Sequence, residues 1–444
     1  MSETMPQTVF KPLAVPATLT QIGEQLAGYD PQALTADAVL AFLAQMVTPL
    51  TGAETVSLFQ ALDRVLAVDV ISPLSVPPHD NSAMDGYAFN GDSLPAAQNL
   101  QAVGTALAGK AWQGQVQAGQ CVKIMTGAIM PPGLDTVVAQ ELAQVDGDRV
   151  QIAAGLLQRG DNRRLCGEDL VQGQPALPAG TRLGPAACGL LASLGLAQVS
   201  VRPRLKVAYF STGDEILSLG DTPREGAVFD SNRYTVHGML TRMGCEVLDM
   251  GVVRDDPALL EAAFRQAASL ADVIITSGGV SVGEADFTKA MMKKLGDVAF
   301  WRIAMRPGRP MAVGRIPQGG RSTEGDRSAV LFGLPGNPVA VMVTFLAFVR
   351  PTLQRMMGMT NAPLPLLKAR SQEVLRKKPG RTEYQRGIVS RNAQGELQVI
   401  ITGNQGSGVL SSMVQANGLI VLHHDQATTQ VGEWVDVMMF DGHL

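Results

Sequence analysis

The sequence has few of the residues that mark a zinc site or a disulfide-bonded fold. Its 444 residues include only four cysteines and five histidines. The cysteines form no CxxC pair and the histidines show no metal-ligand spacing, so neither kind of site is indicated. Free, buried thiols in a reducing compartment are the expected state of the cysteines. No Ser–His–Asp or Cys–His arrangement stands out either.

Two further features are missing, a basic surface and a segment for membrane insertion. A net charge of -4 argues against nonspecific nucleic-acid binding, which needs a basic face. The first twenty residues contain one lysine, several prolines and no long apolar core, unlike a signal peptide or an anchor. No window is expected to approach the roughly 18 apolar residues of a membrane helix. We therefore expect a cytoplasmic protein without nucleic-acid or membrane partners.

The chain length and changes in residue pattern along the sequence predict several domains. A chain of 444 residues exceeds what one hydrophobic core usually organises. A loosely ordered leader is expected first, followed by helices over 36–46 and 58–66 and then short β-like runs broken by glycine and proline. Pro203 marks a boundary, and β-like runs return after Pro363. The predicted segments are a flexible leader (1–35), a helical and β-rich region (36–203), an α/β domain (204–352) and a C-terminal β domain (363–444).

The α/β domain is predicted from alternating strands and helices. Apolar strands are expected over 205–210, 245–250 and 273–275, with helices over 232–243 and from Asp256 onward. Asp256 followed by proline is a helix N-cap signal. This alternation predicts a parallel sheet with helices on both faces, and the domain is expected to end in a strand, a GLPGNP turn and an apolar helix.

Glycines and carboxylates follow the predicted strands. The segment ADVIITSGGVSVGEAD leads from a buried strand into Gly278 and Gly279 and then to Glu284 and Asp286. Such a loop can approach a phosphate closely, and the acids suggest a cation beside it. A single acid next to glycine is usually a turn residue. Acids after several strands of one sheet, including Glu215 and Asp255, are expected to meet in one crevice.

A basic run opposes these acids. FWRIAMRPGRP carries Arg302, Arg306 and Arg309, and arginine binds tetrahedral oxyanions through paired N–H groups. Arg302 and Arg306 would share one side of an extended segment. A charged edge strand is the alternative interpretation. The GLPGNP turn precedes a helix whose N-terminal N–H groups could bind an anion.

Together these segments resemble the molybdopterin molybdenumtransferases, the MoeA family that includes the E domain of gephyrin. The matching motifs occur in the family's order from about residue 36 to the C-terminus. They are PPHDNSAMDGYA, IMTGAIMPPG, GED, STGDE, DSNR, RDDP, SGGVSVGEAD and GLPGNP.

The resemblance implies a multidomain α/β plus β protein. It would have two interleaved N-terminal domains that are helical and β-rich (36–203), a three-layer molybdopterin-binding α/β domain, and a C-terminal β-barrel-like domain. It also implies an elongated homodimer with each active site between two subunits. The implied substrates are adenylylated molybdopterin and molybdate, with Mg²⁺ as cofactor and AMP as product. An adenylyltransferase and apo-molybdoenzyme chaperones are conceivable partners.

The resemblance also carries site residues, in three groups. The implied catalytic residues are Asp85, Thr126, Asp169, Glu215, Asp255 and Asp286. Glu215, Asp255 and Asp286 would hold Mg²⁺. The implied substrate-binding residues are Asp230, Asn232, Gly278, Gly279, Ser281, Arg302, Arg306, Pro335, Gly336 and Pro338. The family commonly has lysines where this chain has Arg302 and Arg306, which leaves the preference between molybdate and tungstate open.

Two other functions remain open at this stage. An adenylyltransferase that makes the adenylylated pterin shares the α/β domain, but that activity does not need the other regions. A scaffold or cofactor carrier could keep the fold without chemistry, although it would not need the full set of acids. Release of AMP in response to molybdate separates the transferase from both.

Overall fold

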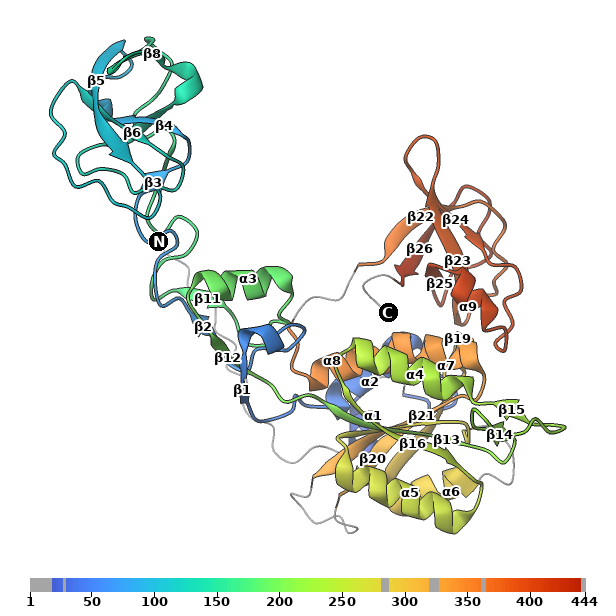
Figure 1. Ribbon diagram of the computed structural model, residues 1–444. Coiled ribbons are helices and arrows are strands. Elements are labelled where there is room, and N and C mark those ends of the chain that lie inside the picture. Colours follow the sequence, from blue (N-terminus) through green and yellow to red (C-terminus); the bar gives the residue numbers. More distant parts are fainter. Residues whose placement is uncertain (1–17, 27–28, 281–286, 319–326, 361–364, 441–444) are drawn as a thin grey trace. The chain divides into compact units, whose positions relative to one another are not determined.

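The computed structural model describes residues 18–26, 29–280, 287–318, 327–360 and 365–440 (Figure 1). The chain divides into two compact units. Unit 1 contains residues 1–54, 63–65 and 202–444, and unit 2 contains residues 55–62 and 66–201. Each unit is described by itself.

A six-stranded sheet is the centre of unit 1, in the order β16-β13-β17-β21-β20-β18. The first four strands run parallel, and β20 and β18 are antiparallel to their neighbours. The strands predicted at 205–210, 245–250 and 273–275 are confirmed. Their observed bounds, in sheet order, are Glu246–Val253, Lys206–Thr212, Val273–Ser277, Ser328–Leu334, Pro310–Pro317 and Asp297–Arg302.

Helices cover both faces of this sheet, which confirms the predicted three-layer α/β domain. Helices α4 (Ser231–Arg242) and α7 (Pro338–Thr344) share one hydrophobic core, whereas α5 (Pro257–Leu270) and α6 (Phe287–Leu295) belong to another (Figure 1). The central strands are buried on both faces, as expected for parallel strands with helices on either side. Asp256 caps α5 by accepting from two backbone N–H groups, as its sequence predicts.

The longest helix of unit 1 corrects one expectation. Helix α7, the π-helical turn η4 (Phe345–Val349) and α8 (Arg350–Met356) form a continuous helical segment of 19 residues from Pro338 to Met356. This helix is long and apolar enough to pass a membrane-span test, contrary to the prediction that no window approaches that limit. It is 72% buried inside the protein and its side chains belong to the main core, as in a core helix.

The predicted leader is wrong from Leu19 onward. Helix α1 (Leu19–Gln25) begins with a capping box at Thr18, and its residues Leu19 and Ile22 are buried in the core of unit 1. Helix α2 (Ala36–Met46) follows, as its apolar spacing predicts. Burial of two apolar side chains explains why this segment is ordered despite its polar flanks.

The C-terminal strands close into a barrel. Strands β23 (Thr382–Arg391), β24 (Leu397–Ile401), β22 (Leu367–Ser371), β26 (Trp434–Met439) and β25 (Gly418–Leu422) pair in that order, and β25 pairs again with β23. Closure removes the exposed sheet edges and confirms the β-barrel expectation. The short strand β19 (Met305–Arg306) joins this sheet by pairing with β23, and helix α9 (Ser411–Gln415) packs against β23.

Unit 2 is rich in short strands. Its main sheet has the order β7-β4-β6-β5-β9-β8. Three further strand pairs are β1-β12, β2-β11 and β3-β10, and helix α3 (Pro185–Ser193) lies between β11 and β12 in the chain. The helix predicted over 58–66 is wrong. Only one 3-10 turn forms, η1 (Leu58–Gln60), and Asp63 then adopts a positive φ of 62° that a helix cannot contain. The bounds of the main-sheet strands, in sheet order, are Thr136–Ala139, Gly86–Phe89, Gln120–Ile124, Gln98–Ala106, Arg149–Ile152 and Gln144–Asp146.

The remaining short elements complete the description. Strands β14 and β15 pair in unit 1, and η2 and η3 are 3-10 turns of unit 2. Their bounds and those of the three further pairs are β1 Glu54–Ser57, β2 Val70–Ile71, β3 Asn81–Ser82, η2 Gly91–Ser93, η3 Gln140–Leu142, β10 Arg163–Arg164, β11 Pro175–Leu177, β12 Gln198–Val201, β14 Ile216–Leu217 and β15 Val228–Phe229.

Candidate active site

The glycine loop after β17 has the backbone that its sequence predicts. Gly278 and Gly279 have φ values of +91° and +66°, which favour glycine. A Cβ on Gly278 would lie 2.6 Å from the backbone oxygen of Thr212, and one on Gly279 would lie 2.5 Å from the Cβ of Thr288. The loop is therefore packed tightly against β13 and α6. Three predicted residues of the same segment, Ser281, Glu284 and Asp286, lie outside the described residues.

Asn232 joins three segments of the predicted site. Its Nδ2 donates to Ser277 Oγ at 2.7 Å and to the backbone oxygen of Gly336 at 2.8 Å. One side chain of α4 thus connects the end of β17 to the turn after β21. Pro335 is buried in that turn, and Pro338 is the first residue of α7. The structure therefore brings together the substrate-binding residues predicted in these three segments.

Several buried polar atoms around this junction have no hydrogen-bond partner in the described part of the chain. Such atoms are rare because burying a polar group without a hydrogen bond costs roughly 1–3 kcal/mol. Half of the side chains with such an atom, among the described residues, belong to the carboxyl ends of the parallel strands or the helices beside them. They are Thr212 (Oγ1), Asp230 (Oδ2), Asn232 (Oδ1), Thr276 (Oγ1) and Thr288 (Oγ1). This concentration is typical of a site that a ligand or ordered water completes.

Tyr209 and Ser211 were missed by the sequence analysis. The Tyr209 hydroxyl lies 2.9 Å from Ser211 Oγ, and Tyr209 is 1% exposed. Burial raises the pKa of the Tyr209 hydroxyl, so this group stays protonated at neutral pH. Ser277 contacts the same hydroxyl, which links it to Asn232. The sequence did contain a signal for this residue: Tyr209 is a polar-tipped side chain within the apolar strand β13, which leads into the polar loop STGDE.

The predicted metal-binding acids are partly placed. Glu215 follows β13 and Asp255 follows β16, its parallel neighbour, and both strands end at the same sheet edge. The backbone N–H of Asp255 donates to Asp214 Oδ1 at 3.3 Å. Within the described ranges no three acidic, imidazole or thiol side chains are grouped closely enough to hold a metal ion. Asp286 is outside these ranges, so the full triad stays a prediction.

The two predicted arginines do not belong to one extended strand. Arg302 ends β18 and pairs with Pro310 in the α/β sheet, whereas Arg306 lies in β19 and pairs with Glu383 of the barrel. The expectation that they share a continuous segment is therefore wrong. The chain turns between them, because Arg302 and Arg306 are hydrogen-bonded into different sheets.

Arg306 lines a pocket of about 340 Å³ on the barrel side, together with Arg376 and Arg386. Arg386 is 1% exposed and donates to Ser412 Oγ and to the backbone oxygens of Asn404 and Gly406. It forms no ion pair with a carboxylate among the described residues. Burial, and next the charge of Arg306, lower the pKa of Arg386. One carboxylate, that of Glu383, lines the same pocket and is paired with Arg381. The basic run gave no indication of Arg386, since it lies 80 residues after Arg306.

Of the three site residues predicted in unit 2, Asp85 and Thr126 are in contact with each other. The backbone N–H and the hydroxyl of Thr126 both donate to Asp85 Oδ1 at 2.7 Å. These hydrogen bonds lower the pKa of the Asp85 carboxyl. Asp169 is exposed, and its backbone N–H donates to the Val76 oxygen; no contact joins it to Asp85 or Thr126.

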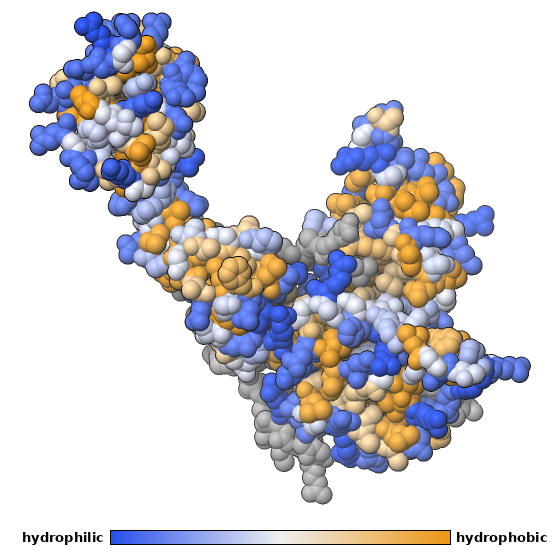
Figure 2. All heavy atoms as spheres, in the orientation of Figure 1, coloured by the Kyte–Doolittle hydropathy of each residue, from blue (hydrophilic) through white to orange (hydrophobic). Residues whose placement is uncertain are grey.

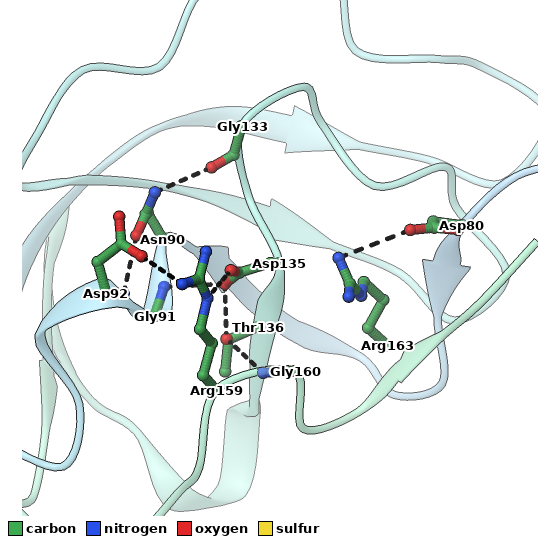
Figure 3. Close-up of polar contacts among 10 residues, drawn as sticks. All are labelled: Asp80, Asn90, Gly91, Asp92, Gly133, Asp135, Thr136, Arg159, Gly160 and Arg163. Carbon is green, nitrogen blue, oxygen red and sulfur yellow. Dashed lines mark hydrogen bonds and ion pairs between the residues drawn. The ribbon is translucent and has the colours of Figure 1, made fainter.

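A second polar cluster in unit 2 holds the loop before β10 against the sheet (Figure 3). Asp135 accepts from Arg159 Nε, the Gly91 N–H and the Thr136 hydroxyl. Burial opposes ionisation of Asp135, but these donors outweigh it and lower the pKa of its carboxyl. In the same view Arg163 lies 3.6 Å from Asp80. The cluster therefore fixes the segment that leads to β10. Strand β10 pairs with β3, and β3 begins at Asn81, four residues before Asp85.

Comparisons with known proteins identify the family of the chain. Residues 34–195 match the MoeA N-terminal region (domain I and II), residues 208–355 match a probable molybdopterin binding domain, and residues 368–440 match the MoeA C-terminal region (domain IV). A molybdopterin molybdenumtransferase of Haemophilus influenzae is 40% identical over 412 residues, covering 93% of this chain and 99% of that protein. The Nostoc enzyme of the same name is 35% identical, covering 83% and 84%.

A solved structure gives the same result. The crystal structure of the molybdopterin biosynthesis moeA protein from Pyrococcus horikoshii has a TM-score of 0.74 and 27% identity, covering 92% of this chain and all of that one. Sequence and fold thus agree over nearly the whole length. The chain belongs to the MoeA family.

Proposed function

We propose that this chain is a Mg²⁺-dependent molybdopterin molybdenumtransferase of the cytoplasm. It takes adenylylated molybdopterin and molybdate, cleaves the bond between the pterin phosphate and AMP, and leaves molybdenum on the dithiolene. Two relatives with the name molybdopterin molybdenumtransferase align with 93% and 83% of this chain. The observation that carries the proposal is the Asn232 junction, where a glycine loop, a helix N-terminus and unpartnered polar atoms meet.

Cleavage of a phosphoanhydride depends on charge neutralisation and positioning more than on a covalent nucleophile. Water attacks the phosphorus, and AMP leaves with the electrons of the broken P–O bond. Gly278 and Gly279 have positive φ values and pack without side chains against Thr212 and Thr288. A glycine backbone of this kind can approach a phosphate closely, which is the role proposed for this loop. Ser281 extends this segment in the proposed site.

Glu215, Asp255 and Asp286 are the proposed Mg²⁺ ligands. Carboxylate oxygens are the donors that Mg²⁺ prefers, and Glu215 and Asp255 follow neighbouring parallel strands at one sheet edge. The bound ion would neutralise phosphate charge. Among the described residues, the hydrogen bond from Asp255 N–H to Asp214 holds the two acid-bearing loops together.

The proposed molybdate site is the pocket at Arg306. Arg306, Arg376 and the buried Arg386 supply positive charge to this pocket, and the Glu383 carboxylate that also lines it is bonded to Arg381. Guanidinium groups bind tetrahedral oxyanions through paired N–H donors. Arg302 remains a proposed contributor at the end of β18. Since Arg386 is fixed by three hydrogen bonds, it provides a rigid half of this site.

The active site is proposed to be shared in a homodimer, with Asp85, Thr126 and Asp169 supplied by the second subunit. Apolar surface on unit 2 supports a subunit contact: Phe59 is fully exposed in η1, which contacts α3, where Figure 2 shows hydrophobic residues at the surface. Exposed apolar patches commonly mark protein interfaces.

A complementation experiment tests the shared site. Asp85→Asn and Glu215→Gln proteins, each inactive alone, are mixed, dissociated and reassociated. A shared site gives heterodimers with one intact centre, so activity returns. If each site lay within one chain, no mixture would be active.

The function itself is tested with purified protein, Mg²⁺ and adenylylated molybdopterin. AMP release that requires molybdate is the expected result, and Asp286→Asn should abolish it without changing the oligomeric state. AMP release that ignores molybdate would remove the transferase assignment. Net formation of adenylylated pterin from ATP would favour an adenylyltransferase, and binding without turnover would favour a scaffold or carrier. Titrating tungstate against molybdate measures the oxyanion preference.

A further inference from the structure

Two acceptor oxygens at the start of α4 have no donor among the residues that the structure describes. Asp230 is the N-cap residue and Asn232 is the second residue of the helix. They are 4% and 8% exposed, and Asp230 Oδ2 and Asn232 Oδ1 are both buried without a hydrogen-bond partner among the described residues. We propose that these oxygens form the subsite that recognises the paired N–H donors of the pterin ring.

The orientation of the Asn232 amide is fixed by its surroundings. Both Nδ2 hydrogens are used, one by Ser277 Oγ and one by the Gly336 backbone oxygen. Rotating the amide would place Oδ1 against the Gly336 oxygen, and two acceptors repel each other. Asn232 Oδ1 therefore presents only acceptor capacity, and no donor to it lies among the described residues.

Asp230 offers the same kind of group. Its Oδ1 accepts the backbone N–H of Arg233 as the helix cap, and this leaves Oδ2 free. A carboxylate oxygen here repels the phosphate of a substrate and attracts N–H groups. The phosphate therefore belongs at the glycine loop, and this subsite takes the donor-bearing part of the ligand.

The matching chemistry is a cyclic guanidine edge, with an amino group beside a ring N–H. The pterin ring has this edge at its 2-amino group and N3. This assignment rests on the proposed function, because that function supplies the pterin. It adds which part of the substrate is read and by which atoms, and it predicts discrimination against a ring with a 2-carbonyl in place of the 2-amino group.

The experiment compares the binding of pterin and lumazine, which differ by that replacement. Asp230→Asn keeps the cap acceptor but replaces the free oxygen with an NH₂ group. Pterin should bind about ten-fold or more weakly to this variant, because a charge-assisted hydrogen bond is lost. Lumazine should bind to Asp230→Asn as tightly as to the unmodified protein, or more tightly. Asp230→Ser is a second variant that keeps a capping hydroxyl and lacks the free oxygen.

Asp256→Asn is the matched control, since Asp256 also caps a helix and contacts only backbone N–H groups of α5. It should keep the preference of the unmodified protein for pterin. Thermal unfolding of all three variants checks the fold. An unchanged preference for pterin in both Asp230 variants, or no preference in the unmodified protein, overturns the subsite. Molybdate-dependent AMP release in the unmodified protein would then show that the proposed function stands without it.

Discussion

Replacing Gly278 with alanine tests the glycine loop most directly. Gly278 has a φ of +91°, and a Cβ there would lie 2.6 Å from the Thr212 backbone oxygen. The positive φ costs an L-residue about 1–2 kcal/mol, and relieving such an overlap costs about 1–3 kcal/mol. Alanine gains roughly 0.4–1 kcal/mol from its less flexible unfolded chain. The net loss of unfolding free energy should be about 1–5 kcal/mol.

Gly336→Ala is the matched comparison. Gly336 lacks a positive φ, and a Cβ there has nothing within 4 Å. Its effect on stability should stay within about 0.5 kcal/mol. If substrate occupies the space beside Gly336, this variant should nevertheless raise the KM for adenylylated molybdopterin. The two glycines would then separate stability from substrate binding.

Urea unfolding measures the stability of both variants, and AMP release measures their activity. Equal unfolding midpoints and slopes for Gly278→Ala, Gly336→Ala and the unmodified protein would refute the argument from backbone geometry. The same result would show that the loop relaxes to accept a side chain. It would also remove the reason for assigning Gly278 to a close backbone contact with phosphate.

The remaining predictions concern other parts of the molecule. Thr126→Val removes the hydroxyl donor to Asp85, so the pKa of Asp85 should rise toward its ordinary value in an NMR titration; an unchanged pKa would contradict the hydrogen-bond explanation. Because the folded pKa of Asp85 is lowered, its contribution to stability is present above the unfolded pKa and is lost as pH falls through the folded pKa. Arg386→Met should weaken molybdate binding measured by calorimetry at least about ten-fold, whereas Arg370→Met, which removes an arginine stacked on an aromatic ring at the barrel surface, should not; equal affinities would exclude the pocket. Lys377→Met removes an ammonium that donates to three backbone oxygens and should lower the thermal midpoint without changing the molybdate affinity of the folded protein.

The sequence alone determined the domain types and the local chemistry. Alternation of apolar strands and helices predicted the parallel sheet, because a strand buried on both faces needs apolar residues throughout. Asp256 and its proline predicted a helix start, since capping depends on neighbouring backbone groups. The glycines of SGG predicted positive φ values for the same local reason, and the motif order predicted the MoeA family.

Tertiary structure decided which of these residues meet. Arg302 and Arg306 are four residues apart but enter different sheets, because β19 pairs with the barrel strand β23. Arg386 lies in β23 and meets Arg306 because β19 pairs with that strand, a contact across 80 residues that no local pattern encodes. Leu19 and Ile22 order the N-terminal segment because a core far away in the sequence buries them. Asn232 joins the glycine loop to the turn at Gly336 through side-chain hydrogen bonds across 45 and 104 residues, so only packing of α4 against the sheet could place it there.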